Sequence, residues 1–279
     1  MGSPMAANLL MAGHQLTVYD TRREATAELE RMGAARAPDL VSLARAVRVT
    51  LTSLPDDTVV DAVVFGGPRS HGLMSGARPG DIVFDLSTVS PASTRRLAAR
   101  AAERGVKLID APVSGGVSGA RAGTLAVMIG ATEEDIAPWG PIFSAIGSQI
   151  FALGEVGRGN MLKLLNNYVA LTNQAVLCEA MALADRLGIA RETLADVLAR
   201  GSGASFILER KRAALAARDY RPGFFVDLAL KDLRLALELA QEVGARGQVA
   251  REAWRLYGEA SQEGFGALDS SGLLRLLEP

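Results

Sequence analysis

Lys163 and Asn167 are the two side chains in this sequence best suited to acid–base chemistry. They lie four residues apart in a segment with helical periodicity, residues 157–167 (GRGNMLKLLNN), so a helix places both on one face. Leu164 and Leu165 make much of the remaining surface apolar. A lysine on such a helix can be desolvated, which lowers its pKa toward neutrality, where a general acid/base works best. A single helical lysine is usually a surface charge, so this interpretation needs support from other motifs.

A glycine-rich segment at residues 110–120 (DAPVSGGVSGA) is suited to binding an anion. Glycines let backbone N–H groups approach an anion closely, and a serine adds a hydroxyl donor. Ser114, Gly115 and Gly116 are therefore candidates for holding a substrate carboxylate. A flexible glycine loop without a ligand is an equally good interpretation.

A second polar segment, residues 85–91 (DLSTVSP), ends a predicted strand and opens a predicted helix. In open α/β sheets, ligands bind at the carboxyl ends of the strands. We therefore expect its hydroxyl and amide groups to lie at the ligand-binding edge. Ser90, directly before Pro91, has the pattern of a helix N-cap.

The start of the chain resembles the later part of a dinucleotide-binding motif. Such a motif opens with an apolar strand, a glycine-rich turn and a helix whose N-terminus holds the pyrophosphate. Here residues 1–10 already have a helical pattern, and Gly13 is suited to end that helix. The following strand ends at Asp20, where an acid would bind the adenosine ribose. Alone this signal is weak, because an acid after a strand is usually a solvated turn residue.

The elements that must position these residues change character along the chain. Up to about residue 153, strand patterns alternate with helical ones, which predicts a parallel sheet covered by helices. The predicted strands are Leu16–Tyr19, Arg48–Ser53, Asp81–Leu86, Lys107–Asp110, Leu125–Gly130 and Gln149–Leu153. The predicted helices between them are Arg22–Met32, Asp57–Phe65, Pro91–Arg104 and Glu133–Ala145.

Beyond Gly157 every predicted element is a helix. The predicted helices are Asn160–Leu187, Arg191–Ala199, Phe206–Ala217, Asp227–Val243 and Val249–Gln262. The sequence thus predicts an α/β, Rossmann-like domain at residues 1–155 and an all-α domain at residues 156–279. The boundary is expected within Gly154–Gly159.

Composition excludes several classes of protein. Charged residues make up 22% and the net charge is -1, which does not suit a nucleic-acid partner. The single cysteine, Cys178, excludes an internal disulfide and fits a buried thiol, and two histidines give no clustered zinc site, so no metal is expected. The chain has neither a signal-peptide pattern nor an apolar run of about 20 residues. We expect a cytoplasmic protein without a membrane partner.

The DAPVSGG loop and the GxGxxxKxxNN helix, in this order and spacing, resemble the β-hydroxyacid dehydrogenase family. Residues 224–233 (FFVDLALKDL) and the ending at residues 266–271 (GALDSS) match it as well. That family includes 3-hydroxyisobutyrate dehydrogenases and tartronate semialdehyde reductases. Residues 1–9 match the second half of the family's G-x-G-x-M-G-x-P-M-A-x-N-L pattern, with Gly2 as its third glycine. The resemblance covers essentially the whole chain apart from the front.

The resemblance implies a role for each matching residue. Lys163 would be the acid/base, Asn167 would orient the substrate, and Ser114, Gly115 and Gly116 would hold its carboxylate. The nicotinamide cofactor would contact Gly2, Asp20, Leu54, Pro55, Thr88 and Lys231. Asp20 would disfavour the 2′-phosphate of NADP, whereas Arg22 and Arg23 could bind it, so NAD is slightly favoured over NADP. The family resemblance also implies a homodimer or homotetramer.

The expected loss of the first strand leaves two explanations open. One is a start site placed at an internal methionine of a longer protein, which we favour. The other is a truncated chain that binds cofactor poorly, because losing a central strand exposes apolar helix surface and unpaired backbone groups. Two functional alternatives remain: a non-catalytic binding or scaffold protein, and an imine reductase-like enzyme, against which Lys163 argues.

Overall fold

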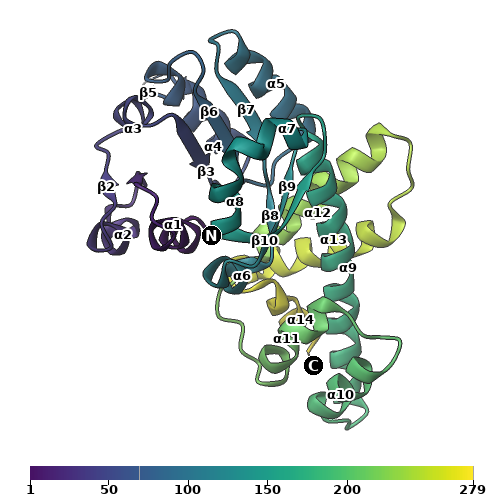
Figure 1. The fold of residues 1–279 in the computed structure, drawn as a ribbon. Coiled ribbons are helices and arrows are strands. Elements are labelled where there is room, and N and C mark those ends of the chain that lie inside the picture. Colours follow the sequence, from purple (N-terminus) through teal and green to yellow (C-terminus); the bar gives the residue numbers. More distant parts are fainter. Residues whose placement is uncertain (69, 279) are drawn as a thin grey trace. The chain divides into compact units, whose positions relative to one another are not determined.

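The computed structural model describes residues 1–68 and 70–278, which form two compact units (Figure 1). Unit 1 comprises Met1–Lys163, and unit 2 begins at Leu164. The division falls inside one long helix, α9 (Arg158–Arg186), rather than in the preceding loop. The first turns of this helix therefore belong to unit 1, and most of its length belongs to unit 2.

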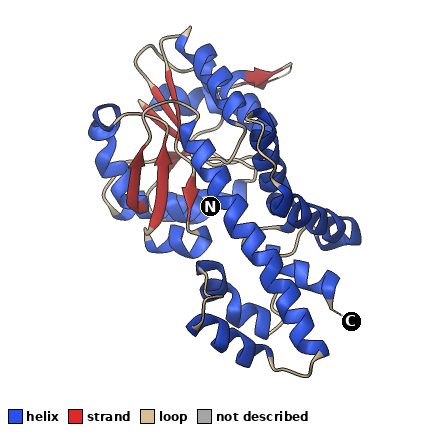
Figure 2. Cartoon of the chain, turned by 90° about the vertical axis from the view of Figure 1, so that its right-hand side faces the viewer, coloured by secondary structure: helices blue, strands red, loops and turns tan. Residues whose placement is uncertain are grey.

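The strands of unit 1 form small separate sheets, with all named strands ending by residue 152 (Figure 2). A parallel sheet has the order β3 (Val49–Thr52), β6 (Ile82–Asp85) and β7 (Lys107–Asp110). A second parallel pair joins β1 (Thr17–Val18) to β2 (Ala35–Arg36). A third sheet has the order β10 (Gly147–Ala152), β9 (Leu125–Ile129) and β8 (Val113–Ser114), and a short hairpin joins β4 (Gly66–Gly67) to β5 (Ser70–His71).

The β3–β6–β7 sheet is the part of unit 1 that positions the polar segments. All four residues of β6 are buried, which is typical of a strand covered on both faces. Its register pairs Thr52 with Asp85, and Asp85 with Asp110. The carboxyl ends of the three strands therefore meet at one edge, and the segments that follow them start close together.

Some helices of unit 1 begin at a residue whose side chain caps them, and others have no side-chain cap. Asp56, Ser90 and Thr132 each accept a hydrogen bond from a backbone N–H in the first turn of the helix that follows. In chain order, the helices of unit 1 are α1 (Gly2–Met11), α2 (Ala27–Arg31), α3 (Leu40–Ala46), α4 (Asp57–Phe65), α5 (Pro91–Ala102), α6 (Gly116–Ala122), α7 (Glu133–Ile136) and α8 (Gly140–Ile146).

Two predicted helices of unit 1 are divided. The expected helix Arg22–Met32 consists of a 3₁₀ turn at Arg23–Ala25 and α2. The expected helix Glu133–Ala145 is divided into α7, a 3₁₀ turn at Ala137–Trp139, and α8. Pro138 and Pro141 lie in this stretch, and each proline lacks the N–H that a continuous helix would need. The prediction of one helix was therefore wrong.

The first helix, α1, is covered by the core of unit 1. Met5 and Leu9 are each 4% exposed and belong to the same apolar cluster as Phe84 and Leu125. The Asn8 side chain donates a hydrogen bond of 2.8 Å to the Ala120 carbonyl. The buried side chains of α1 therefore pack against strands and helices of the same unit.

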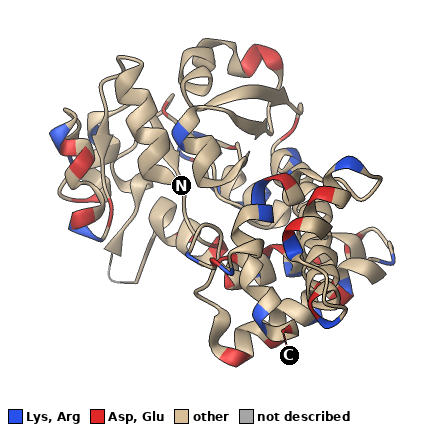
Figure 3. Ribbon diagram, turned by 90° about the horizontal axis from the view of Figure 1, so that it is seen from below, with Lys and Arg blue, Asp and Glu red and all other residues tan. Residues whose placement is uncertain are grey.

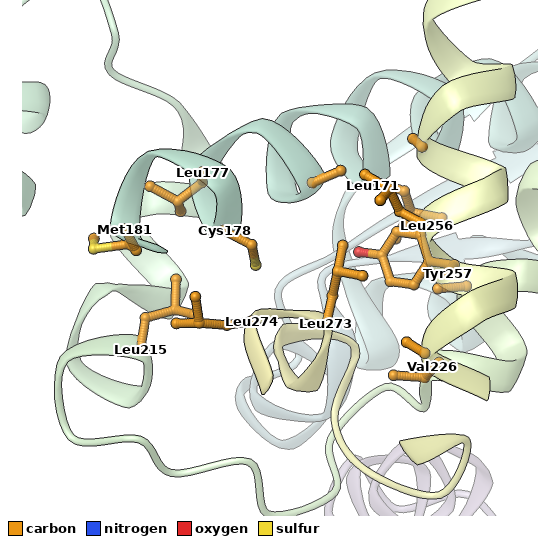
Figure 4. Packing of buried hydrophobic residues seen from close by; sticks show 14 of the residues in the cluster. Leu171, Leu177, Cys178, Met181, Leu215, Val226, Leu256, Tyr257, Leu273 and Leu274 are labelled. Atoms are coloured by element: carbon orange, nitrogen blue, oxygen red, sulfur yellow. The ribbon is translucent and has the colours of Figure 1, made fainter. Parts of the chain in front are cut away.

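Unit 2 is built from helices, as the sequence predicts. After α9 these are α10 (Arg191–Arg200), α11 (Phe206–Ala216), α12 (Val226–Glu242), α13 (Gln248–Ala260) and α14 (Leu273–Leu277). Figure 4 shows their core, in which Cys178 lies near Leu273 and Tyr257. Burial raises the pKa of the Cys178 thiol to about 12, which makes it a structural thiol rather than a nucleophile.

The surface helices of unit 2 carry both signs of charge. Figure 3 shows Lys and Arg residues interleaved with Asp and Glu residues along them. Examples are the pairs Arg234–Glu238 and Arg255–Glu252, each spaced as neighbours on a helix face. In the part of the chain that the structure describes, no helix has both the length and the apolar character needed to cross a membrane.

Candidate active site

Four of the residues expected to contact a cofactor belong to segments that meet at the carboxyl ends of β3 and β6. A Cβ atom on Gly2 would lie 3.8 Å from Cβ of Ser53, so the N-terminus of α1 adjoins the end of β3. The next residue, Leu54, donates its N–H to Oγ of Ser87 at 2.9 Å. Pro55 follows Leu54 and Thr88 follows Ser87. The structure therefore brings together three segments that are separate in the sequence, since Leu54 and Ser87 alone are 33 residues apart.

The Asp85 side chain bonds to both segments at this edge of the sheet. Its carboxylate accepts hydrogen bonds from Oγ1 of Thr52 at 2.7 Å and from the N–H of Ser87 at 3.1 Å. Asp85 is 1% exposed, and burial raises the pKa of its carboxyl group. The side chain thus links the end of β3 to the segment that carries Thr88.

Asp20 follows β1, in the two-stranded sheet. Its Oδ1 atom accepts the N–H of Arg22 at 2.8 Å, and the Arg22 guanidinium lies 3.6 Å from the same atom. The Arg22 side chain is 73% exposed, so it can turn toward a ligand without leaving a buried contact. The acid and the arginine that compete in the cofactor prediction are therefore neighbours.

The candidate carboxylate-binding residues lie at a junction between a strand and a helix, not in a long loop. Ser114 ends β8, and Gly116 begins α6. Gly115 has φ 134°, and a Cβ there would lie 2.9 Å from Cδ2 of Leu125. Only glycine fits this conformation and this space. The segment therefore connects the end of β8 directly to the start of α6, with glycine required at Gly115.

Lys163 and Asn167 lie on α9, one turn apart. Lys163 is 8% exposed and Asn167 is 6% exposed, so both polar side chains are removed from bulk water. A lysine is rarely buried to this extent unless it is paired with another group or takes part in chemistry. The sequence-based expectation of a desolvated lysine is thus consistent with its position.

In unit 2, Asn167 and Lys231 meet at a carboxylate that the sequence analysis did not single out. Nδ2 of Asn167 donates to Oδ2 of Asp232 at 2.6 Å, and Nζ of Lys231 lies 3.0 Å from Oδ1 of the same residue. Asp232 is 1% exposed. It directly follows Lys231 in the KDL segment, and a charged residue on a buried helix face was the signal that could have identified it.

The residues of unit 1 fit a dinucleotide cofactor better than a metal ion. Backbone and hydroxyl groups from three separate segments gather at the carboxyl edge of the parallel sheet, which is the usual place for a dinucleotide in such sheets. Within residues 1–68 and 70–278, no group of three or more His, Cys, Asp or Glu side chains is arranged to hold a metal ion.

Two family models together match almost the whole chain. The NAD-binding domain of 6-phosphogluconate dehydrogenase matches residues 1–154. The NAD-binding domain of NADP-dependent 3-hydroxyisobutyrate dehydrogenase matches residues 157–277. The first match starts at residue 1, so it does not support the prediction that the front of the cofactor domain is missing.

Individual relatives agree with these matches. A 2-(hydroxymethyl)glutarate dehydrogenase of Eubacterium barkeri is 36% identical over all of this chain and 92% of its own length. An NAD-dependent L-serine dehydrogenase of Pseudomonas aeruginosa is also 36% identical, over all of this chain and 95% of its own. Among solved structures, a 3-hydroxyisobutyrate dehydrogenase from Salmonella typhimurium superposes with a TM-score of 0.91 at 28% identity, covering 99% of this chain and 95% of that one.

Proposed function

The chain belongs to the β-hydroxyacid dehydrogenase family of NAD(P)-dependent enzymes, and on this premise we propose that it interconverts a small β-hydroxy acid and its semialdehyde with Lys163 as general acid/base. The observation that carries the proposal is the burial of Lys163 in the first turns of α9, where it is 8% exposed. Lysine is rarely buried to this extent unless it is paired with another group or has a chemical role. The same observation argues against a non-catalytic scaffold.

Each candidate residue has one task in the proposed reaction. In reduction, Nζ of Lys163 gives a proton to the carbonyl oxygen, and in oxidation it accepts the hydroxyl proton. The nicotinamide ring, when bound, supplies or accepts the hydride. Asn167 orients the reacting group, and the Ser114-Gly115-Gly116 segment binds the carboxylate through a hydroxyl and backbone N–H groups.

The cofactor-binding roles follow from the carboxyl edge of the sheet in unit 1. Gly2, Leu54, Pro55 and Thr88 line the ends of the segments there, and Asp20 binds the adenosine ribose. In unit 2, Lys231 is held beside Asp232 and contacts the cofactor near the nicotinamide. The lysine charge would stabilise the anionic substrate or the cofactor amide.

The experiment that tests this function measures cofactor reduction with a panel of hydroxy acids. The panel comprises 3-hydroxyisobutyrate, L-serine and 2-(hydroxymethyl)glutarate, with tartronate semialdehyde assayed in the reducing direction. We expect a rate with at least one of them, and no rate with an alcohol of the same size that lacks a carboxylate. Binding of NADH without turnover of any acid would support the scaffold alternative instead. Turnover of a cyclic imine alone would support the imine reductase alternative.

Changing Asp20 to asparagine is expected to move cofactor preference toward NADP. Removing one negative charge near the 2′-phosphate should change the ratio of kcat/KM for NADP to kcat/KM for NAD by about tenfold, equivalent to about 1.4 kcal/mol. The measurement is steady-state kinetics with both cofactors. The control is Asp39→Asn, which removes the exposed carboxylate that caps α3. An unchanged ratio in Asp20→Asn would show that Asp20 does not read the ribose.

We also propose a homodimer or homotetramer assembled along α9. Large apolar side chains are exposed along this helix at spacings of three, four and seven residues: Leu162, Leu165, Val169, Val176 and Leu183, and Leu187 directly after its end, each at least 44% exposed. An apolar stripe with this spacing is typical of a helix that packs against another.

Changing Val176 to glutamate should therefore separate the subunits. A charge in the middle of an apolar stripe must be desolvated when two copies associate. Sedimentation velocity at micromolar concentration should show an oligomer for the parent chain and a smaller species for the variant. Val243→Glu, at a position that is 73% exposed beyond the end of α12, is the control and should keep the parent mass. A parent chain that sediments as a monomer would contradict the proposal.

A further inference from the structure

The carboxylate of Asp110 sits at the start of the helix that carries Lys163. Asp110 ends β7 and has no exposed surface. Its Oδ1 atom accepts the N–H of Gly157 at 2.7 Å, and its Oδ2 atom accepts the N–H of Asn160 at 2.8 Å. The first N–H groups of a helix have no acceptor within the helix. Asp110 therefore satisfies donors of α9 from a strand 47 residues earlier in the chain.

At two positions the backbone lies so close to this carboxylate that only glycine fits. A Cβ on Gly130 would lie 2.1 Å from Oδ1 of Asp110. A Cβ on Gly159 would lie 2.8 Å from Oδ2 and 2.3 Å from the Met128 carbonyl oxygen. Glycine at these two positions lets the backbone at the start of α9 and directly after β9 contact the Asp110 side chain. These contacts fix where the helix starts along its axis and how it is rotated about that axis.

Asn160 ties the same turn to the segment that carries Thr88. Its Oδ1 atom accepts the N–H of Val89 at 3.1 Å, and its Nδ2 atom donates to Oγ1 of Thr94 at 3.2 Å. Asn160 has no exposed surface. The first turn of α9 is therefore bonded both to β7 and to the segment between β6 and α5.

Lys163 lies three residues after Asn160, on the same face of the helix one turn later. We propose that Asp110 is a positioning residue for the reaction, which sets Lys163 at the correct place relative to the segment of Thr88. The inference rests on the proposed function, because it assumes that Lys163 is the acid/base. Four residues then fix the start of α9, and with it Lys163: Asp110, Asn160, Gly130 and Gly159.

The need for a helix cap does not by itself explain why residue 110 is an aspartate. A serine or asparagine caps a helix without a buried charge. Burial raises the pKa of the Asp110 carboxyl group, and the neighbouring Asp85 lies opposite it in the strand register. Each of the two carboxyl oxygens accepts one N–H, whereas serine has a single oxygen and asparagine has one oxygen and one N–H₂ group.

The test replaces Asp110 with asparagine, which keeps the shape but presents an N–H₂ group to one of the two helix N–H groups. We expect kcat to fall by about tenfold to a hundredfold, since small misplacements of a catalytic group have effects of this size. The dissociation constant for NADH, measured by fluorescence, should change less than threefold. A fall in kcat with an equal loss of cofactor affinity would overturn the proposal.

The readout specific to positioning is the double variant. If Asp110 acts through Lys163, then Asp110→Asn should not slow a chain that already carries Lys163→Met. An equal fall in both backgrounds would overturn the proposal. Asp81→Asn is the matched control, because Asp81 is a buried carboxylate at the opposite end of β6 that pairs with Arg48 at 3.0 Å. It should lower the melting temperature and leave kcat unchanged.

A third variant covers the case in which Asp110→Asn does not fold. Thr94→Val removes the hydroxyl that Asn160 binds and keeps the buried shape. We expect a several-fold fall in kcat that again disappears when Lys163 is methionine, and full kcat would overturn the proposal. The two proposals fail differently: a chain with Lys163→Met at full kcat refutes the proposed function. An inactive Lys163→Met chain together with fully active Asp110→Asn and Thr94→Val refutes the positioning role alone.

Discussion

Replacing Lys163 with methionine is expected to lower kcat by about a thousandfold, within the range found for losing a general acid/base. Methionine fits a position that is 8% exposed without adding a charge or a large cavity. The proton that accompanies hydride transfer would then have no donor or acceptor at the reacting oxygen. The rate is measured by single-turnover absorbance of NADH with the best substrate of the panel.

Two comparisons make this result specific. NADH fluorescence should give the same dissociation constant for the variant and the parent, because Lys163 acts on the substrate and not on the cofactor. Lys107→Met, which removes an exposed lysine paired with Asp135 at 3.2 Å, should keep full kcat. A Lys163→Met chain that retains more than a tenth of the parent rate would rule out the acid/base role.

Replacing Asp232 with alanine is the second change with a large expected effect. It would leave the Lys231 ammonium and the Asn167 amide without the carboxylate between them, in a region where Asp232 is 1% exposed. Removing one partner of a buried ion pair typically lowers stability by about 3–5 kcal/mol. Because Asn167 would also lose the acceptor that fixes its amide, we expect kcat/KM to fall by about a hundredfold.

The stability and the activity are measured separately. Urea denaturation gives the free energy of unfolding, and kinetics at low urea concentration give kcat/KM. Asp227→Ala is the control on the same helix, since Asp227 is exposed and accepts a bond from Ser261 at 2.6 Å. It should change the free energy of unfolding far less. If Asp232→Ala matched this control in both measurements, the contacts of Asn167 and Lys231 with Asp232 would contribute to neither stability nor activity.

Helices and strands with an uninterrupted apolar period were predictable from the sequence. The strand Lys107–Asp110 and the helix Asp57–Phe65 have their predicted limits, and the long helix begins and ends within two residues of its prediction. In each case the apolar period continues up to a capping or turn residue. The two-residue strand β2 and the short helix α3 are too short to show a period, so they were not predicted.

The candidate site was predictable only where its residues share one segment. Lys163 and Asn167 lie on one helix, and the spacing alone places them on one face. Asp110 contacts Gly157 and Asn160 from 47 and 50 residues away, and Asp232 contacts Asn167 from 65 residues away. Such contacts depend on how strands and helices pack. No local pattern in a single sequence contains that information.

The pair β1–β2 has a consequence for how unit 1 moves. It has two residues in each strand and its own small apolar cluster, centred on Val18, Leu29 and Ala34, apart from the larger clusters around β6. A region with so few buried contacts opens by local fluctuation more often than the rest of a domain. Its amide protons should therefore exchange with solvent sooner than those of β6. Because Asp20 follows β1, a bound adenosine ribose would slow that exchange in proportion to its occupancy, making residues 16–37 an internal reporter of cofactor binding.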